Sequence, residues 1–139
     1  MNGKDNFAKT ASAFNDRDVA AFTALYAADA VVSDPFSPEP LRGRDAIAQD
    51  MADVLRAMSD ARFTVGRMLE EGDLVVGEFT VAGTHDGPFA TATGEIAPTG
   101  NPVRLEGAVF SRLNAMGEVI EERRYYDVAS VLHQLGAAA

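Results

Sequence analysis

The chain has 139 residues, no cysteine, and a formal charge of −9 from 21 acidic and 12 basic residues. Hydrophobic residues make up 47% and charged residues 24%, as in a globular protein that buries a real core. The negative charge disfavours nucleic acid as a partner, and the lack of cysteine excludes disulfides, thiolate nucleophiles and Cys-ligated metals. We expect one domain over residues 1–139.

No segment contains the ~18 consecutive apolar residues that a membrane span requires, and residues 1–18 are polar with no apolar signal region. The sequence therefore predicts a cytoplasmic protein without a membrane partner.

Residues 5–28 carry apolar side chains at helical spacing that is interrupted at Asn15 and Asp16, which predicts two helices. The second is expected to begin near Asp16 or Asp18, because aspartate favours helix caps. Residues 30–34 form a short predicted strand, and residues 35–43 hold three of the six prolines and predict a stiff loop.

A third helix is expected from Arg44, because an apolar stripe follows at helical spacing. This stripe consists of Ile47, Met51, Val54, Leu55 and Met58. After Asp60 the pattern changes to that of strands, with turns at residues 72–73, 99–100 and 116–117. The predicted strands cover residues 61–69, 73–85, 102–113 and 118–127.

Residues 86–101 are rich in Gly, Thr and Pro and are consistent with either a short strand or a long loop. Residues 128–135 predict a last helix with Asp127 as its cap, followed by a frayed end at residues 137–139. Helices first and antiparallel strands afterwards indicate an α+β fold with the helices on one face of the sheet.

Several segments resemble the nuclear-transport-factor-two-like superfamily, especially its ketosteroid-isomerase and SnoaL-like polyketide-cyclase branches. They are residues 26–47, GTHDGPF, PTGNPVRLEG and GEVIEERRYYD. The resemblance implies a cone-shaped, curved antiparallel or mixed sheet covered by N-terminal helices, a cystatin-like roll, which encloses an apolar pocket. Because isomerases, cyclases, epoxide hydrolases, dehydratases and non-catalytic modules share this fold, function must be argued from the site.

Asp34 matches the general base of ketosteroid isomerases, and burial in an apolar pocket would make it a better base. The alternative is that Asp34 only caps the turn before Pro35. The sequence departs from the isomerase pattern at the oxyanion donors, where it has Thr10 and Val109, or Ala108 in a shifted alignment. We therefore do not expect steroid isomerisation.

Side chains alternate across the last strand, and matching Gly117 to the family's turn glycine places Glu122, Arg124 and Tyr126 in the pocket. Arg124 occupies the position of an acidic residue in SnoaL-like cyclases. Asp34, Arg124 and Glu122 together resemble the carboxylate–arginine–carboxylate group of limonene-type epoxide hydrolases, in which one carboxylate is the base and another the acid. The alternative is a surface ladder of cross-strand ion pairs.

Two further residues are candidate catalytic residues. Tyr26 occupies a helix position that lines the pocket in relatives. His85 has the same strand parity as Phe79 and Val81. Each has a structural alternative, as a core tyrosine or part of a turn. The candidate substrate-binding residues are Thr10, Met51, Phe79, Val81, Val109, Tyr126 and Phe36. We expect no cofactor, and no metal site because the two histidines are far apart with no ligand spacing.

Two functions are compatible with these residues. The first is an enzyme that isomerises, cyclises or opens an epoxide in a small apolar substrate, with Asp34 as the general base. The second is a non-catalytic module that binds a small molecule or forms a dimer. A homodimer is expected in either case, because the convex sheet faces of the superfamily often pair.

Overall fold

The computed structural model describes residues 2–136, so the predicted fraying at residues 137–139 lies outside the described residues. The helices are α1 (Gly3–Asn15), α2 (Val19–Thr23), α3 (Gly43–Ala57) and α4 (Val128–Gln134). The main sheet contains β1 (Tyr26–Ser33), β2 (Leu41–Arg42), β3 (Arg62–Glu71), β4 (Leu74–Thr84), β7 (Pro102–Leu113) and β8 (Val119–Tyr126). A separate hairpin consists of β5 (Phe89–Thr91) and β6 (Gly94–Ile96).

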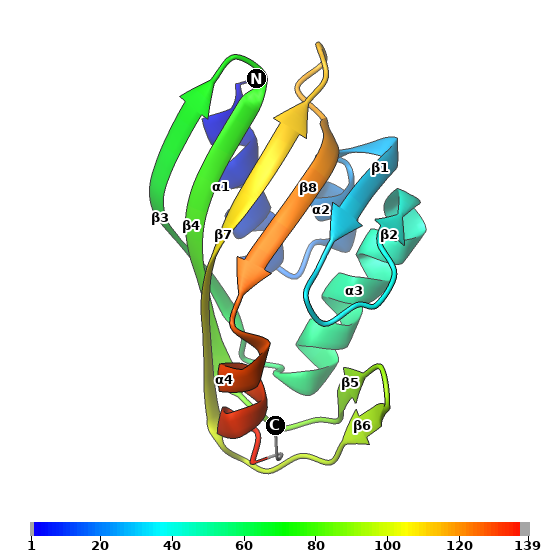
Figure 1. Cartoon of the computed structure of the whole chain (residues 1–139), viewed down its shortest axis with the longest axis vertical. Coiled ribbons are helices and arrows are strands. Elements are labelled where there is room, and N and C mark those ends of the chain that lie inside the picture. The colour runs from blue at the N-terminus through cyan, green and yellow to red at the C-terminus, as the bar shows by residue number, and fades with distance from the viewer. Residues whose placement is uncertain (1, 137–139) are drawn as a thin grey trace.

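The six main strands form one curved, mixed sheet in the order β2–β1–β8–β7–β4–β3 (Figure 1). Neighbouring strands of this sheet are antiparallel except for β1 and β8. These two strands run parallel, with Val32 opposite Glu122 and Ser33 opposite Arg123. Helices α1, α2 and α3 lie on one side of the sheet, whereas α4 and the β5–β6 hairpin lie at one end. The predicted α+β class, with a curved sheet covered by N-terminal helices, is confirmed.

The boundary between α2 and β1 differs from the prediction at Tyr26. Helix α2 begins after Asp18, whose carboxylate accepts the Ala21 N–H at 3.0 Å, and ends at Thr23 after five residues. Tyr26 is therefore a strand residue, paired with Val119. The helical assignment of Tyr26 was wrong because pairing with a distant strand overrides the local helical pattern.

The two proline- and glycine-rich segments contain more regular structure than local sequence indicates. Residues 35–43, predicted as a loop, contain the two-residue strand β2, which pairs with β1. Residues 86–101 contain the β5–β6 hairpin. Asp127 caps α4 as predicted, by accepting the Ser130 N–H at 3.1 Å. Within residues 2–136, no helix is both long and apolar enough to cross a bilayer.

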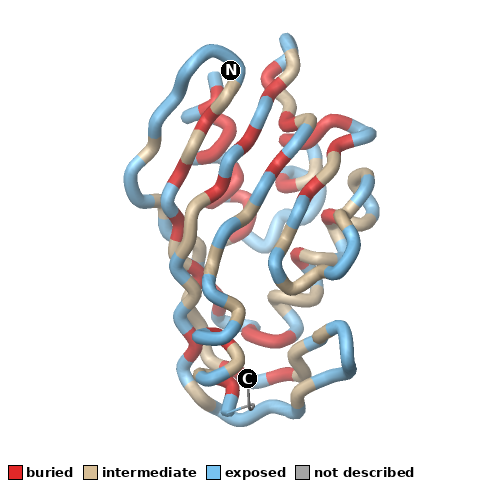
Figure 2. The backbone as a smooth tube through the Cα atoms, in the orientation of Figure 1, coloured by how far each residue is buried: buried red, intermediate tan, exposed pale blue. Residues whose placement is uncertain are grey.

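Buried and exposed residues alternate along the central strands (Figure 2), and an aromatic cluster joins α1 to the sheet. The Phe63 ring lies 5.9 Å from that of Phe7, 5.8 Å from that of Phe14 and 5.5 Å from that of Phe79, centroid to centroid. Burying each such ring contributes about 1.5–3 kcal/mol to stability. Gly77 permits this packing, because a Cβ there would lie 2.7 Å from the Phe7 ring.

Candidate active site

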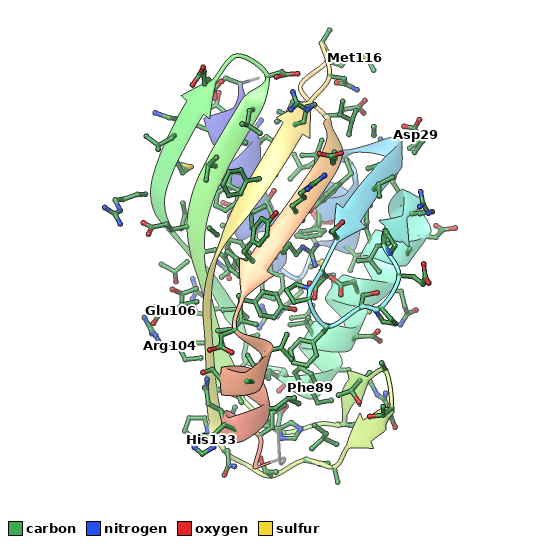
Figure 3. The ribbon with its side chains drawn as sticks, in the orientation of Figure 1. Asp29, Phe89, Arg104, Glu106, Met116 and His133 are labelled. Carbon is green, nitrogen blue, oxygen red and sulfur yellow. The ribbon has the colours of Figure 1, made fainter. Side chains whose placement is uncertain are left out.

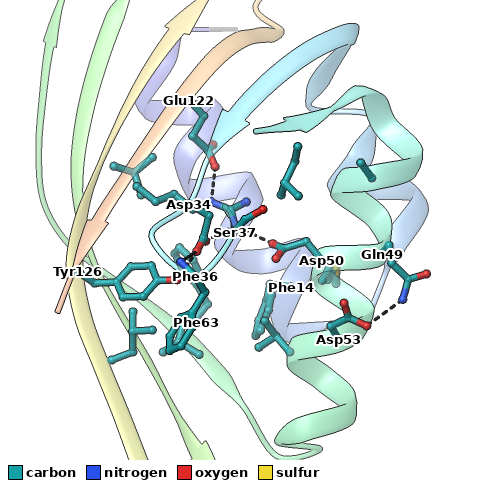
Figure 4. A pocket seen from close by; sticks show the side chains of 18 of the residues that line it. Phe14, Asp34, Phe36, Ser37, Gln49, Asp50, Asp53, Phe63, Glu122 and Tyr126 are labelled. Atoms are coloured by element: carbon teal, nitrogen blue, oxygen red, sulfur yellow. Dashed lines mark hydrogen bonds and ion pairs between the residues drawn. The ribbon is translucent and has the colours of Figure 1, made fainter. Parts of the chain in front are cut away.

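A cavity of about 480 Å³ lies between the sheet and the helices, and most of its wall is apolar. Polar side chains gather at one part of this wall, where the end of β1, strand β8 and helix α3 meet (Figure 4). The aromatic residues that line the cavity are Phe7, Phe14, Phe22, Tyr26, Phe36, Phe63, Phe79, Phe89 and Tyr126. An apolar cavity with a few convergent polar groups is the usual form of a small-molecule site.

Strand β8 contributes its even-numbered side chains to the cavity. Glu122, Arg124 and Tyr126 line it, whereas the neighbouring Arg123 and Tyr125 are exposed on the outer face. This is the orientation that the alternation and Gly117 predict. A surface ladder of ion pairs therefore does not describe Arg124, whose side chain is only 14% exposed.

Arg124 joins three carboxylates that come from three elements of the fold. Its Nη1 donates to Asp34 Oδ2 at 3.0 Å and to Asp50 Oδ2 at 2.7 Å, and its Nε donates to Glu122 Oε2 at 2.7 Å. Burial alone lowers the pKa of Arg124, but the carboxylates of Asp50 and Glu122 outweigh this, so the pKa lies above its ordinary value. The guanidinium is therefore a permanent positive charge at the centre of the site.

Asp34 lies just after β1, where Pro35 prevents the strand from continuing as a regular ladder. Its Oδ1 accepts the Phe36 N–H at 2.9 Å and the Tyr126 hydroxyl hydrogen, and its Oδ2 accepts from Arg124. Both interpretations of Asp34 thus describe its geometry, because the same carboxylate caps the turn and lines the cavity. Its side chain is 9% exposed.

Asp50, which the sequence analysis did not select, is the third carboxylate on Arg124. It lies on α3, and its side chain is the most accessible of the three at 26% exposed. Burial raises the pKa of Asp50 above its ordinary value, and the charge of Arg124 offsets only part of this effect. The spacing contains a usable signal, because Asp50 follows Ile47 by three residues and precedes Val54 by four, which places it on the apolar stripe.

Glu122 and the two tyrosines complete the polar group. Tyr26 donates its hydroxyl hydrogen to Glu122 Oε1 at 2.9 Å. Burial, and then the charge of Glu122, raise the pKa of Tyr26, while burial and the charge of Asp34 raise that of Tyr126. Both tyrosines are therefore neutral donors at physiological pH. Both Glu122 oxygens accept hydrogen bonds within the protein, and its side chain is 7% exposed.

The structure brings most of the remaining candidates to the same cavity. The candidate binding residues that line it are Thr10, Phe36, Met51, Phe79, Val81, Val109 and Tyr126. Thr10 does not replace the isomerase oxyanion donor directly, because its hydroxyl donates to the Asn6 carbonyl at 3.0 Å.

His85 is not among the residues that line the cavity, which favours its structural alternative as part of a turn. Strand β4 ends at Thr84, and His85 is fully buried behind Phe89, with 6.3 Å between the ring centroids. Its Nδ1 lies 2.9 Å from Thr99 Oγ1 and accepts the Thr99 N–H at 3.3 Å.

Comparison with known proteins identifies the family. The sequence profile of the SnoaL-like polyketide cyclases matches residues 6–135. The chain belongs to this family. A search of curated proteins found no match. At the level of the family, the profile match supports an enzyme that acts on a small molecule.

Solved structures of the same fold cover almost the whole chain. IdmH from Streptomyces antibioticus, a candidate polyketide cyclase, is 27% identical with a TM-score of 0.78, over 99% of this chain and 100% of its own. A candidate SnoaL-like polyketide cyclase from Jannaschia sp. CCS1 is 19% identical with a TM-score of 0.84, over 99% and 93% of the two chains. SalBIII, an epoxide hydrolase/cyclase-like enzyme with a role in pyran ring formation in the polyether salinomycin, is 17% identical with a TM-score of 0.75, over 91% and 92%.

Proposed function

We propose that this SnoaL-like protein opens an epoxide in a small apolar substrate by general acid–base catalysis, with water or a hydroxyl group of the substrate as the nucleophile. The observation that supports this most is the shared contact of Asp34 and Asp50 with Nη1 of Arg124, at 3.0 and 2.7 Å. One fixed guanidinium thus orients two carboxyl groups beside an apolar cavity. Two carboxyl groups in different environments are the usual arrangement for an acid–base pair.

In this mechanism Asp34 is the base and accepts the proton of the nucleophile as the new C–O bond forms. Asp34 Oδ2 accepts one hydrogen bond, from Arg124, and retains a second lone pair for this proton. Asp50 is the acid, because burial raises its pKa and its side chain is the most accessible of the three, so it gives its proton to the epoxide oxygen as the C–O bond breaks. Glu122 and Tyr26 hold Arg124 in place rather than exchanging protons.

The same mechanism accounts for the residues that depart from the ketosteroid-isomerase pattern. Thr10 and Val109 offer no strong oxyanion donors, which isomerisation through an enolate needs. Epoxide opening needs instead a proton for the leaving oxygen, which Asp50 supplies. SalBIII, which has the same fold, is described as epoxide hydrolase/cyclase-like.

The pH dependence of turnover tests the role of Asp50. With an apolar epoxide selected from a panel of terpene and aryl epoxides, the rate should fall on the alkaline side as Asp50 loses its proton. Asp50→Asn should lower the maximal rate about 10²-fold or more and remove this alkaline fall, since an amide has no proton to lose. Asp45→Asn, an exposed carboxylate of the same helix, is the matched control. An unchanged alkaline limb in Asp50→Asn contradicts the assignment.

A non-catalytic binding module is the second candidate, and the hydrogen bond from the Phe36 N–H to Asp34 favours it. In that case Asp34 only caps the turn that follows β1. Its replacement would change ligand binding or stability, and there would be no chemical step to slow.

We also propose a homodimer formed by the outer face of the sheet. Phe110 and Tyr125 are exposed there, with ring centroids 5.7 Å apart. Around them lie Arg112, Glu121 and Arg123, and charges of both signs can pair across a two-fold axis.

Sedimentation at micromolar concentration should therefore give a dimer, and the double variant Phe110→Ser with Tyr125→Ser should give a monomer. Met116→Ser, at an exposed apolar side chain on the turn before β8, should leave the dimer intact (Figure 3). A monomeric wild type contradicts the proposal.

A further inference from the structure

The cavity wall carries more negative than positive charge. Four carboxylates line it, from Asp34, Asp50, Asp53 and Glu122, against one guanidinium, from Arg124. No lysine or histidine within residues 2–136 is among the lining residues. The formal charge of the lining is therefore −3, or −2 when Asp50 is protonated. A concave apolar wall concentrates the field of such charges inside the cavity.

Asp53 is the carboxylate of this group that lacks a charged partner within the described part of the chain. It lies one turn after Asp50 on α3, and its Oδ1 accepts only the neutral Gln49 amide, at 2.8 Å (Figure 4). Asp34, Asp50 and Glu122, by contrast, all contact Arg124. Asp53 is half-buried at the cavity wall, and no cation of the described residues neutralises its charge.

The aromatic wall of the cavity also suits a positive charge. The faces of aromatic rings attract cations, most strongly where water is excluded. The Phe36 ring lies 5.3 Å from that of Phe89 and 5.9 Å from that of Tyr126. Several rings therefore surround whatever occupies the cavity.

From this charge balance we infer that the substrate of this cavity is a small apolar molecule that carries a protonated amine. Its ammonium group lies against Asp53, its hydrocarbon body lies among the aromatic rings, and Asp50 one turn away stays free for proton transfer. Carboxylates, phosphates and sulfates are excluded by the same field. This inference rests on the proposed function in one respect, namely that the cavity is the substrate site.

Binding of three naphthalene probes of nearly equal size tests the inference. They are 2-naphthylmethylammonium, 2-naphthylmethanol and 2-naphthoate, measured by calorimetry with the full chain at pH 7 and low ionic strength. The ammonium should bind about tenfold more tightly than the alcohol, and the naphthoate at least about tenfold more weakly than the alcohol. Asp53→Asn should reduce the advantage of the ammonium to about threefold or less and leave the affinity for the alcohol unchanged. Asp45→Asn, which removes an exposed carboxylate from the same helix, should preserve the full order.

Equal affinities for the ammonium and the alcohol, an unchanged order in Asp53→Asn, or no binding of any probe would overturn the inference. None of these results concerns proton transfer. The proposed function fails through a different result, namely turnover that survives the loss of Asp34. The two failures are therefore distinguishable.

Discussion

An Arg124→Met variant is expected to lose about 3–5 kcal/mol of unfolding free energy at pH 7, because the change leaves buried carboxylates without their counter-charge. Arg124 is the cation that contacts Asp34, Asp50 and Glu122, and these side chains are 9%, 26% and 7% exposed. Methionine has a similar apolar volume, so the loss reflects charge rather than a cavity. Urea denaturation followed by circular dichroism measures it.

Arg123→Met is the matched control, one residue away on the same strand. Arg123 is 58% exposed and its Nε lies 3.7 Å from Glu121 Oε1, so its replacement should change stability by no more than about 0.5 kcal/mol.

The deficit of Arg124→Met should also shrink as the pH is lowered towards 4. Protons then neutralise the buried carboxylates of Asp34 and Glu122, which the variant leaves unpaired. Equal losses in Arg124→Met and Arg123→Met would contradict a buried charge cluster.

An Asp34→Asn variant is expected to turn over an apolar epoxide about 10²–10⁴-fold more slowly, with little change in KM. Asparagine is nearly isosteric, and its single carbonyl oxygen can still accept the Phe36 N–H, whereas its NH2 group replaces the oxygen that accepted from Arg124. The amide cannot accept the proton of the nucleophile, and the loss therefore appears in kcat.

Asp29→Asn controls for charge on the same strand. Asp29 is exposed on β1 and lies far from the part of the molecule that holds Phe89, a residue of the cavity wall (Figure 3). Its replacement should leave kcat unchanged. A kcat for Asp34→Asn within about twofold of the wild type would remove Asp34 from the mechanism and favour the binding module.

The order of elements and the inward face of β8 could be predicted because both depend on local patterns. Alternation along a strand determines which side chains share a face, and the resemblance of Gly117 to the family's turn glycine indicates that Arg124 and Tyr126 face the pocket. Asp34 could be located because it and the Asp-Pro step after it match the general-base position of ketosteroid isomerases.

The partners of Arg124 could not be predicted in the same way. The contact between Arg124 and Asp50 depends on the position at which α3 packs against β1. No local sequence pattern encodes that position. His85 follows the last residue of β4, so alternation along that strand does not determine where its side chain lies. Tyr26 was assigned to a helix because its pairing with Val119 is 93 residues distant in sequence.

The parallel pairing of β1 with β8 has a consequence for synthesis of the protein. Asp34 and Asp50 precede Arg124 by 90 and 74 residues, so on the ribosome these two carboxylates emerge long before their cation. Until β8 is added, Asp34 and Asp50 remain hydrated and have no reason to lie near each other. Contacts of such long range form late in folding. The site can therefore form only after the last strand has been synthesised. A chain stalled before residue 119 would contain Asp34 and Asp50 but not the guanidinium of Arg124 that holds them together.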